Sequence, residues 1–193
     1  GNEITKTYFL EELSTGKYIP IELEGTSEKL YYQLFELSLK VHPSIVKTIS
    51  IQALKSLNRY EMEGQPFPTF SFTALNGKTY TNENTTGKTL VIKTWFIGCR
   101  ACIAEFPELN EMVHQQKSRD DLLFISLAPD DPERLTAFLQ KKPLDYATVG
   151  YSKTLLKTLN ITEYPTHLII GPDGKIRKIV NHAHQLIELL EAL

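Results

Sequence analysis

The sequence predicts an α/β domain in which a central mixed sheet carries helices on both faces, preceded by a mostly helical N-terminal segment. Residues 89–96 are almost continuously apolar, as expected of a central strand, and a helical pattern follows them. A second strand and helix follow at 122–140, and residues 167–193 predict two short strands and a closing helix. Strand–helix–strand connections place helices over the sheet, and ligands of such sheets bind beyond the carboxyl ends of the parallel strands.

The N-terminal 64 residues differ in character from the rest. Residues 17–23 predict a short strand, and apolar residues at helical spacing predict an amphipathic helix over 27–41. Pro43 suits the first turn of a second helix, whose apolar positions are Ile45, Ile49, Ala53 and Leu57. The run at 63–68, which contains glycine and two prolines, interrupts these patterns. We therefore place an N-terminal extension at 1–64 and the α/β domain at 65–193.

Turn and breaker residues divide the α/β domain further. Residues 70–81 predict a hairpin that reverses through Asn76-Gly77 in a type I′ turn. The helix predicted over 99–117 contains Pro107, which removes one helical hydrogen bond and predicts a kink. The remaining predictions are strands at 122–127, 146–149, 167–170 and 175–180, and helices at 131–140, 152–159 and 183–193.

Both cysteines of the chain lie in the segment Cys99-Arg100-Ala101-Cys102, between the apolar strand and the helix that follows it. Unpaired backbone N–H groups at a helix start favour a thiolate, and a second thiol three residues later allows disulfide exchange. Two cysteines cannot form a disulfide framework, which favours a reactive role. A zinc site would need two further ligands, for which His114, His182 and His184 are candidates by residue type alone. We predict no metal.

Composition and charge exclude several other classes of function. The net charge is −2 and neither sign clusters, so neither nucleic acid nor an anionic membrane surface is indicated as a partner. No apolar run approaches the roughly 18 residues that a spanning helix needs. The chain begins Gly1-Asn2-Glu3 without a recognisable signal, so we expect a membrane link only through an anchor outside this sequence.

Several motifs, in order and with matching spacing, resemble one known family. They are Asn76-Gly77-Lys78, Gly87-Lys88, Trp95, Cys99-Arg100-Ala101-Cys102, Glu105, Pro107-Glu108-Leu109, Tyr164-Pro165-Thr166 and Gly171-Pro172-Asp173-Gly174-Lys175. Together they resemble the TlpA/ResA-like branch of the thioredoxin superfamily, over about residues 67–193. The resemblance implies a thioredoxin-like fold; the first sixty residues lie outside it.

The resemblance also implies a mechanism. Cys99 would be the exposed nucleophile, Cys102 the buried resolving thiol, and Pro165 a cis-proline that faces the dithiol and presents backbone to a peptide. Glu105 would help to move a proton to or from Cys102. The implied activity is that of a thiol–disulfide oxidoreductase, expected to act as a reductant and to need no cofactor beyond its redox-active disulfide. The implied partners are a disulfide-bearing protein substrate and a thiol electron donor, and the implied location is the periplasm of a Gram-negative bacterium.

The chain departs from the family pattern around the dithiol. Gly98 stands where a tryptophan is common, which predicts a more open rim around Cys99. Between the cysteines, Arg100 and Ala101 replace the familiar Gly-Pro or Glu-Pro. A cation beside Cys99 favours its thiolate and raises the reduction potential. The predicted substrate-binding residues are Gly98, Arg100, Ala101, Tyr164, Pro165 and Thr166.

Other interpretations stay open at this stage. Glu105 also suits a first-turn acid that interacts with the helix dipole, and Tyr164 suits a packing role. Trp95 is expected to be a core residue with some exposure at the rim. A peroxiredoxin-like thiol peroxidase would require proline at 92 and threonine at 96, where this chain has Ile92 and Phe96. A redox-inactive binding module, with the N-terminal helices recognising a partner, is the other alternative.

Overall fold

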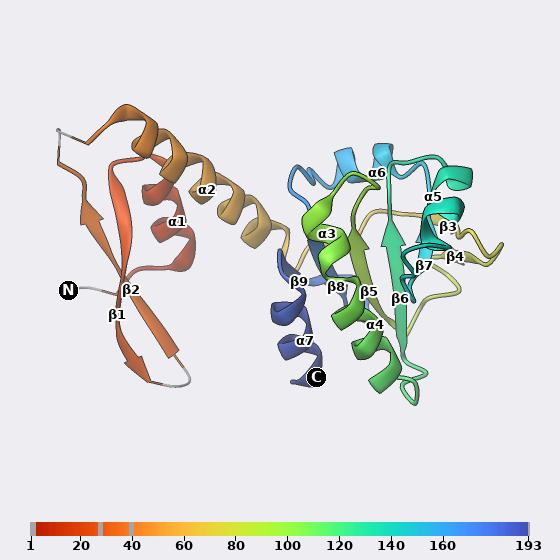
Figure 1. Cartoon of the computed structure of the whole chain (residues 1–193). Coiled ribbons are helices and arrows are strands. Elements are labelled where there is room, and N and C mark those ends of the chain that lie inside the picture. Colours follow the sequence, from red (N-terminus) through yellow and green to blue (C-terminus); the bar gives the residue numbers. More distant parts are fainter. Residues whose placement is uncertain (1–2, 27–28, 39–40, 193) are drawn as a thin grey trace. The chain divides into compact units, whose positions relative to one another are not determined.

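The computed structural model describes residues 3–26, 29–38 and 41–192, which form two compact units (Figure 1). The first unit comprises Gly1–Met62 and the second Glu63–Leu193. The boundary between the units therefore falls two residues before the one placed from the sequence. Each unit is described by itself below.

The N-terminal unit combines two helices with a hairpin. Its elements are α1 (Lys6–Ser14), β1 (Tyr18–Thr26), β2 (Lys29–Glu36) and α2 (Pro43–Met62). The strands pair antiparallel, and Leu10, Leu13 and Ala53 form a small buried core between the helices. The predicted strand at 17–23 and the helix beginning at Pro43 are both present. The helix α1, capped by the Thr5 hydroxyl, was not predicted.

The amphipathic helix predicted over 27–41 is wrong. Residues 29–36 form β2 instead; residues 27–28 and 39–40 lie outside the described part of the chain. Tyr31, Tyr32 and Phe35 favour a strand, and pairing with β1 satisfies the backbone that a helix would have satisfied internally. Tertiary pairing therefore outweighs the helical spacing of the leucines.

The C-terminal unit contains a five-stranded mixed sheet in the order β7-β6-β5-β8-β9. Its strands are β5 (Thr89–Thr94), β6 (Leu122–Leu127), β7 (Ala147–Val149), β8 (Thr166–Ile170) and β9 (Ile176–Val180). Its helices are α3 (Arg100–Ala104), α4 (Phe106–Gln115), α5 (Pro132–Leu139), α6 (Lys153–Thr158) and α7 (Ala183–Glu191). Strands β5, β6 and β7 are mutually parallel, whereas β8 runs antiparallel to β5 and to β9.

The predicted elements of this unit are present with small shifts at their ends, and two details differ. The hairpin of β3 (Ser71–Thr73) and β4 (Thr79–Thr81) is present, but only Gly77 of its turn has a positive φ, so the turn is not type I′. The other detail is the predicted boundary: residues 63–67, where the sequence patterns are interrupted, belong to the C-terminal unit. Gly64 and Phe67 donate backbone hydrogen bonds to Ile176 and Gly174.

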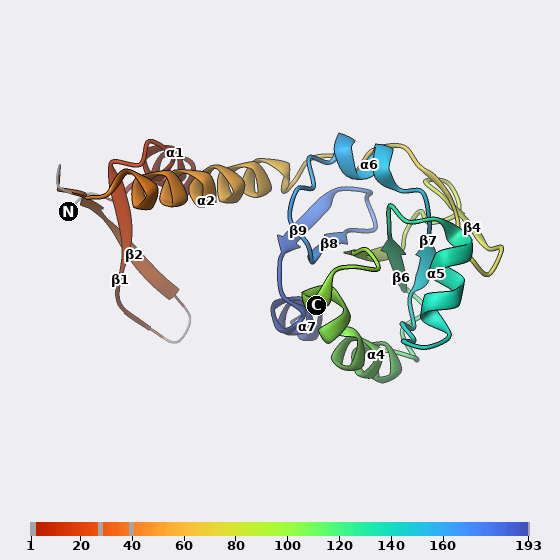
Figure 2. The same ribbon diagram turned by 45° about the horizontal axis from the view of Figure 1, so that its top comes forward.

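The sheet has two differently covered faces. In Figure 2, α4 and α7 lie on one face and α6 on the other. Side chains alternate along β5, so Val91, Lys93 and Trp95 point to the first face. Val91 and Trp95 pack there in the cluster that contains both cysteines. The fold thus places the Cys99-x-x-Cys102 segment at the carboxyl end of β5, over the face that α4 and α7 cover.

Candidate active site

The two cysteines form a disulfide at the start of α3. Cys99 is the N-cap residue of this helix, and its Sγ accepts a hydrogen bond from the backbone N–H of Cys102 at 3.2 Å. Cys99 is 7% exposed and Cys102 is fully buried. Cys99 is therefore largely enclosed in this oxidised form, short of the exposure expected of it, and its role as the nucleophile stays a prediction.

Hydrogen bonds hold the segment just before β8 in place. The Tyr164–Pro165 peptide bond is cis, and the Pro165 carbonyl accepts a hydrogen bond from Asn181 at 3.3 Å. Thr166 is buried; its N–H donates to the Thr94 hydroxyl, which in turn donates to the Thr166 carbonyl. The Thr166 hydroxyl donates to the Glu163 carbonyl. These bonds give Thr166 a structural role here, and its contribution to substrate binding stays a prediction.

Aromatic side chains shape the surface beside Cys99. Trp95 is fully buried, so the partial rim exposure expected of it is wrong. Its indole N–H donates to Ser126 instead. The space beside Gly98 is already lined, because a Cβ there would lie 3.2 Å from the Phe96 ring. Phe96 in turn packs edge to face on Tyr164, with ring centroids 5.3 Å apart. The rim that the missing tryptophan was expected to leave open is therefore partly filled by Phe96.

Glu105 lies between α3 and α4, where Pro107 interrupts the helix as predicted, and it collects three donors. Its Oε2 accepts from Lys93 Nζ at 2.6 Å and from His167 Nε2 at 3.1 Å. Its Oε1 accepts from the backbone N–H of Ala183 at 3.0 Å, at the start of α7. Lys93 and His167 are both fully buried and are partners across the β5–β8 ladder. We call these three side chains the buried charge cluster: Lys93, Glu105 and His167.

The three members of the cluster shift one another's proton affinity. Burial acts to raise the pKa of Glu105, but the hydrogen bonds from His167 and Lys93 and the Lys93 charge outweigh it and lower this pKa to about 2. Burial lowers the pKa of Lys93, an effect that Glu105 only partly offsets. Burial also lowers the pKa of His167. At neutral pH Glu105 is therefore an ionised acceptor in this oxidised form, and its expected part in moving a proton to or from Cys102 stays a prediction.

Two members of this cluster, Lys93 and His167, were not singled out from the sequence. A signal was present for each. Lys93 is a charged residue in an otherwise apolar central strand, and a buried charge requires a partner. His167 occupies a similar position at the start of β8. Their shared partner, Glu105, could not be identified without the pairing of the two strands.

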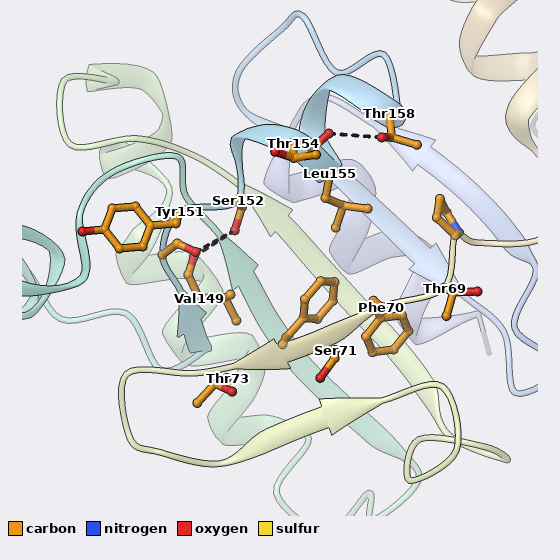
Figure 3. Close-up of a pocket in the computed structure, with 13 residues that line it drawn as sticks. Thr69, Phe70, Ser71, Thr73, Val149, Tyr151, Ser152, Thr154, Leu155 and Thr158 are labelled. Atoms are coloured by element: carbon orange, nitrogen blue, oxygen red, sulfur yellow. Dashed lines mark hydrogen bonds between the residues drawn. The ribbon is translucent and has the colours of Figure 1, made fainter.

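No other site for redox or metal chemistry occurs among the described residues. They contain no group of three or more histidine, cysteine or acidic side chains that could hold a metal ion. A pocket of about 440 Å³ lies between β3 and α6, in the part of the unit that Figure 3 shows. Its lining includes Phe70, Phe72, Leu155 and several hydroxyl side chains, but neither cysteine.

Comparison with known proteins places this fold and dithiol in a family. The model of the AhpC/TSA family matches residues 63–179, which is more than half of the chain and almost all of the C-terminal unit. The chain belongs to the AhpC/TSA family. The match begins at the first residue of the C-terminal unit and contains the disulfide, the cis-proline and the buried charge cluster.

The relatives of this AhpC/TSA-family protein are thiol–disulfide oxidoreductases and thioredoxin-like proteins. The thioredoxin-like protein YneN of Bacillus subtilis is 26% identical over 121 residues, which are 61% of this chain and 70% of YneN. The thiol–disulfide oxidoreductase ResA of Bacillus cereus is 26% identical over 115 residues, 58% of this chain and 66% of ResA. The chain thus spans about two thirds of the length of these relatives.

Solved structures confirm the thioredoxin-like fold of this family member. The thioredoxin domain of a thiol–disulfide oxidoreductase from Bacteroides vulgatus superposes with a TM-score of 0.61, at 21% identity over 67% of this chain and 96% of that domain. A secreted disulfide oxidoreductase from Mycobacterium tuberculosis superposes with a TM-score of 0.55. Its sequence identity is 22%, over 65% of this chain and 96% of that chain. The predicted fold class is confirmed.

Proposed function

We propose that this protein is a thiol–disulfide oxidoreductase that reduces disulfides of protein substrates. The observation that carries the proposal is the Cys99–Cys102 disulfide at the carboxyl end of β5, where Cys99 keeps 7% exposure and Cys102 none. Placement at this edge of the sheet, in a family whose relatives exchange disulfides, favours chemistry over structural cross-linking. The pair needs no further cofactor.

The reaction uses the two sulfurs in sequence. In the reduced protein the Cys99 thiolate attacks a substrate disulfide and forms a mixed disulfide, and one substrate thiolate leaves. Cys102 then attacks Cys99 Sγ, which releases the second substrate thiolate and closes the Cys99–Cys102 bond. The N–H of Cys102, which donates to Cys99 Sγ, stabilises the thiolate, and the exposed Arg100 adds positive charge beside it.

The substrate backbone would lie along Tyr164 and Pro165. Within the described residues, the backbone N–H and C=O of Tyr164 take part in no hydrogen bond, so they are free to pair with an extended peptide. Gly98 and Ala101 are exposed beside Cys99 and leave room for that peptide, while Phe96 and Tyr164 supply an apolar wall. A substrate with an apolar side chain near its disulfide fits this wall.

Serine variants test the assignment. Cys99→Ser is expected to abolish insulin reduction, and Cys102→Ser is expected to accumulate a mixed disulfide with the substrate. Ala137→Ser is the matched control, because it adds a hydroxyl at an exposed position of α5 and leaves both thiols and the substrate-binding residues in place. Wild-type activity of Cys99→Ser would overturn the assignment of the nucleophile. Turnover of peroxide in place of insulin would favour a thiol peroxidase.

For location we propose the periplasm, with a membrane-linked thiol donor that returns electrons to the disulfide. Among the described residues, no helix combines the length and apolar composition that a membrane span requires. The Mycobacterium tuberculosis neighbour is described as secreted, which supports a site of action outside the cytoplasm. Fractionation of cells that express the natural full-length protein, probed with an antibody to residues 63–193, tests the location. Recovery with the cytoplasm would contradict it.

A further inference from the structure

The buried charge cluster leaves one basic atom without a partner. Because Glu105 is ionised, it can only accept hydrogen bonds, so the His167 Nε2 that lies 3.1 Å from it carries the ring proton. His167 Nδ1 is then a bare acceptor. Among the described residues it is one of two buried side-chain nitrogen or oxygen atoms without a hydrogen-bond partner, and the other is the Tyr146 hydroxyl. An unpaired acceptor in a protein core requires an explanation.

The histidine lies on the same side of the sheet as the resolving cysteine. Side chains alternate along β8, so His167 shares its face with Ile169, which packs in the same apolar cluster as Cys102. Glu105 follows Cys102 by three residues, which is about one helical turn, and its carboxylate contacts the histidine ring. The ring thus contacts the residue that lies one helical turn after the buried thiol, on the same face of the sheet.

We propose that Nδ1 of His167 accepts the proton of the Cys102 thiol when Cys102 attacks the mixed disulfide, while Glu105 and Lys93 position the ring. This inference rests on the proposed disulfide exchange. It assigns the removal of the Cys102 proton, a step that neither sulfur performs. The Cys102 S–H bond breaks and its proton goes to Nδ1. The Cys102–Cys99 bond forms, and the electron pair of the broken Cys99–substrate bond leaves on the substrate sulfur. In the oxidised protein Nδ1 has released this proton to the substrate thiolate or to solvent and is bare again, and a proton is taken up through the ring when Cys102 is next reduced.

The surroundings of the ring suit this role. Protonation of Nδ1 would give an imidazolium in contact with the ionised Glu105. The carboxylate stabilises this cation through its hydrogen bond with Nε2. Burial lowers the pKa of His167, and Lys93 from β5 and His182 before α7 lower it further, so the ring is neutral at rest. The Tyr146 hydroxyl cannot replace it, since a buried neutral phenol is a poor base.

The two thiol steps can be followed separately in the full chain. Reduced protein mixed with 5,5′-dithiobis(2-nitrobenzoate) releases one coloured thiolate when Cys99 attacks and a second when Cys102 resolves the mixed disulfide. His167→Gln keeps a side-chain N–H for Glu105 but cannot bind a proton. We expect it to slow the second release by about 100-fold near neutral pH. The first release should change by less than about twofold, because Cys99 does not depend on this ring.

The pH profile separates proton transfer from mere support of the fold. In the variant, the second rate is expected to rise about tenfold per pH unit, since only hydroxide removes the proton. In the wild type it should level off as the histidine becomes neutral. His114→Gln is the matched control, because His114 also contacts a carboxylate, Asp145, at 2.9 Å but is exposed. It should leave both releases unchanged.

Each outcome has one meaning. An unchanged second release in His167→Gln, with the same pH profile as the wild type, overturns the inference and leaves the proposed function standing. Loss of the first release in the wild type would overturn the proposed function itself. If His167→Gln does not fold, nitrogen NMR of the wild-type imidazole decides. The inference requires the Nδ1 signal of His167 to differ between the oxidised and reduced protein, and identical titration in both states contradicts it.

Discussion

At the residue scale, the buried ion pair of Lys93 and Glu105 makes either partner costly to remove. Replacing Lys93 by methionine leaves a buried carboxylate without its cation, and we expect a loss of about 3 kcal/mol of unfolding free energy at pH 7. Urea unfolding followed by Trp95 fluorescence measures this, because Trp95 is the chain's single tryptophan and lies in the same unit. Lys178→Met is the control: it removes a half-exposed partner of Glu63 and should cost less than about 1 kcal/mol.

The pH dependence of that loss has a defined sign. The folded pKa of Glu105, about 2, lies below its ordinary value of 4.5, so the carboxylate stabilises the fold fully above about pH 4.5 and loses this contribution as the pH falls toward 2. The difference between wild type and Lys93→Met should shrink across the same window. A difference that stays constant from pH 7 to about pH 3 would contradict the assignment to this ion pair.

At the residue scale, sequence reasoning related only side chains close to the cysteines along the chain, and their catalytic roles stay predictions. Cys99, Cys102 and Glu105 lie within seven consecutive positions, so helical spacing was enough to relate them. Lys93 and His167 are 74 positions apart and meet only because β5 and β8 pair. Their role depended on a strand register that no local pattern encodes.

At the element scale, the end of β5 is fastened to the segment that carries Pro165. The Thr94 hydroxyl accepts from the N–H of Thr166 and donates to its C=O, so Thr94→Val removes the side-chain partner of two buried backbone groups. We expect a loss of about 2 kcal/mol and faster hydrogen exchange at the Thr166 amide. The exposed hydroxyl pair of Thr73 and Thr79 provides the control, because Thr73→Val should cost less than about 0.5 kcal/mol. Equal losses of unfolding free energy in the two variants would show that the Thr94 hydroxyl does not hold this segment in place.

The elements also differ in how well the sequence pattern predicts them. Strands such as β5 and β6 were predicted within two residues, because each is a short apolar run bounded by turn residues. The hairpin strand β2 was mistaken for a helix. Its leucines recur at helical spacing, while its stability comes from pairing with β1. The spacing of apolar residues predicts an element correctly when that element buries one face by itself. The prediction fails when pairing with another strand determines the structure.

At the scale of the whole molecule, the division into two units predicts that residues 63–193 fold and exchange disulfides without the first 62 residues. The apolar side chains of the C-terminal cluster all come from its own elements. We expect a fragment of 63–193 to unfold within about 1 kcal/mol of the full chain and to reduce insulin at the same rate. Trp95 fluorescence and the insulin assay measure both. A fragment that aggregates or is inactive would show that the units depend on each other.

A shorter fragment sharpens the test, because it locates the start of the fold. Residues 69–193 lack the backbone bonds of Gly64 and Phe67 to the β8–β9 turn region, together with the Phe67 side chain, which is only 5% exposed. Losing a buried phenylalanine costs about 3–5 kcal/mol, so this fragment should be markedly less stable than 63–193. Equal stability of the two fragments would mean that 63–68 is a linker after all. A difference of the expected size would instead make this segment the first structural element of the catalytic unit.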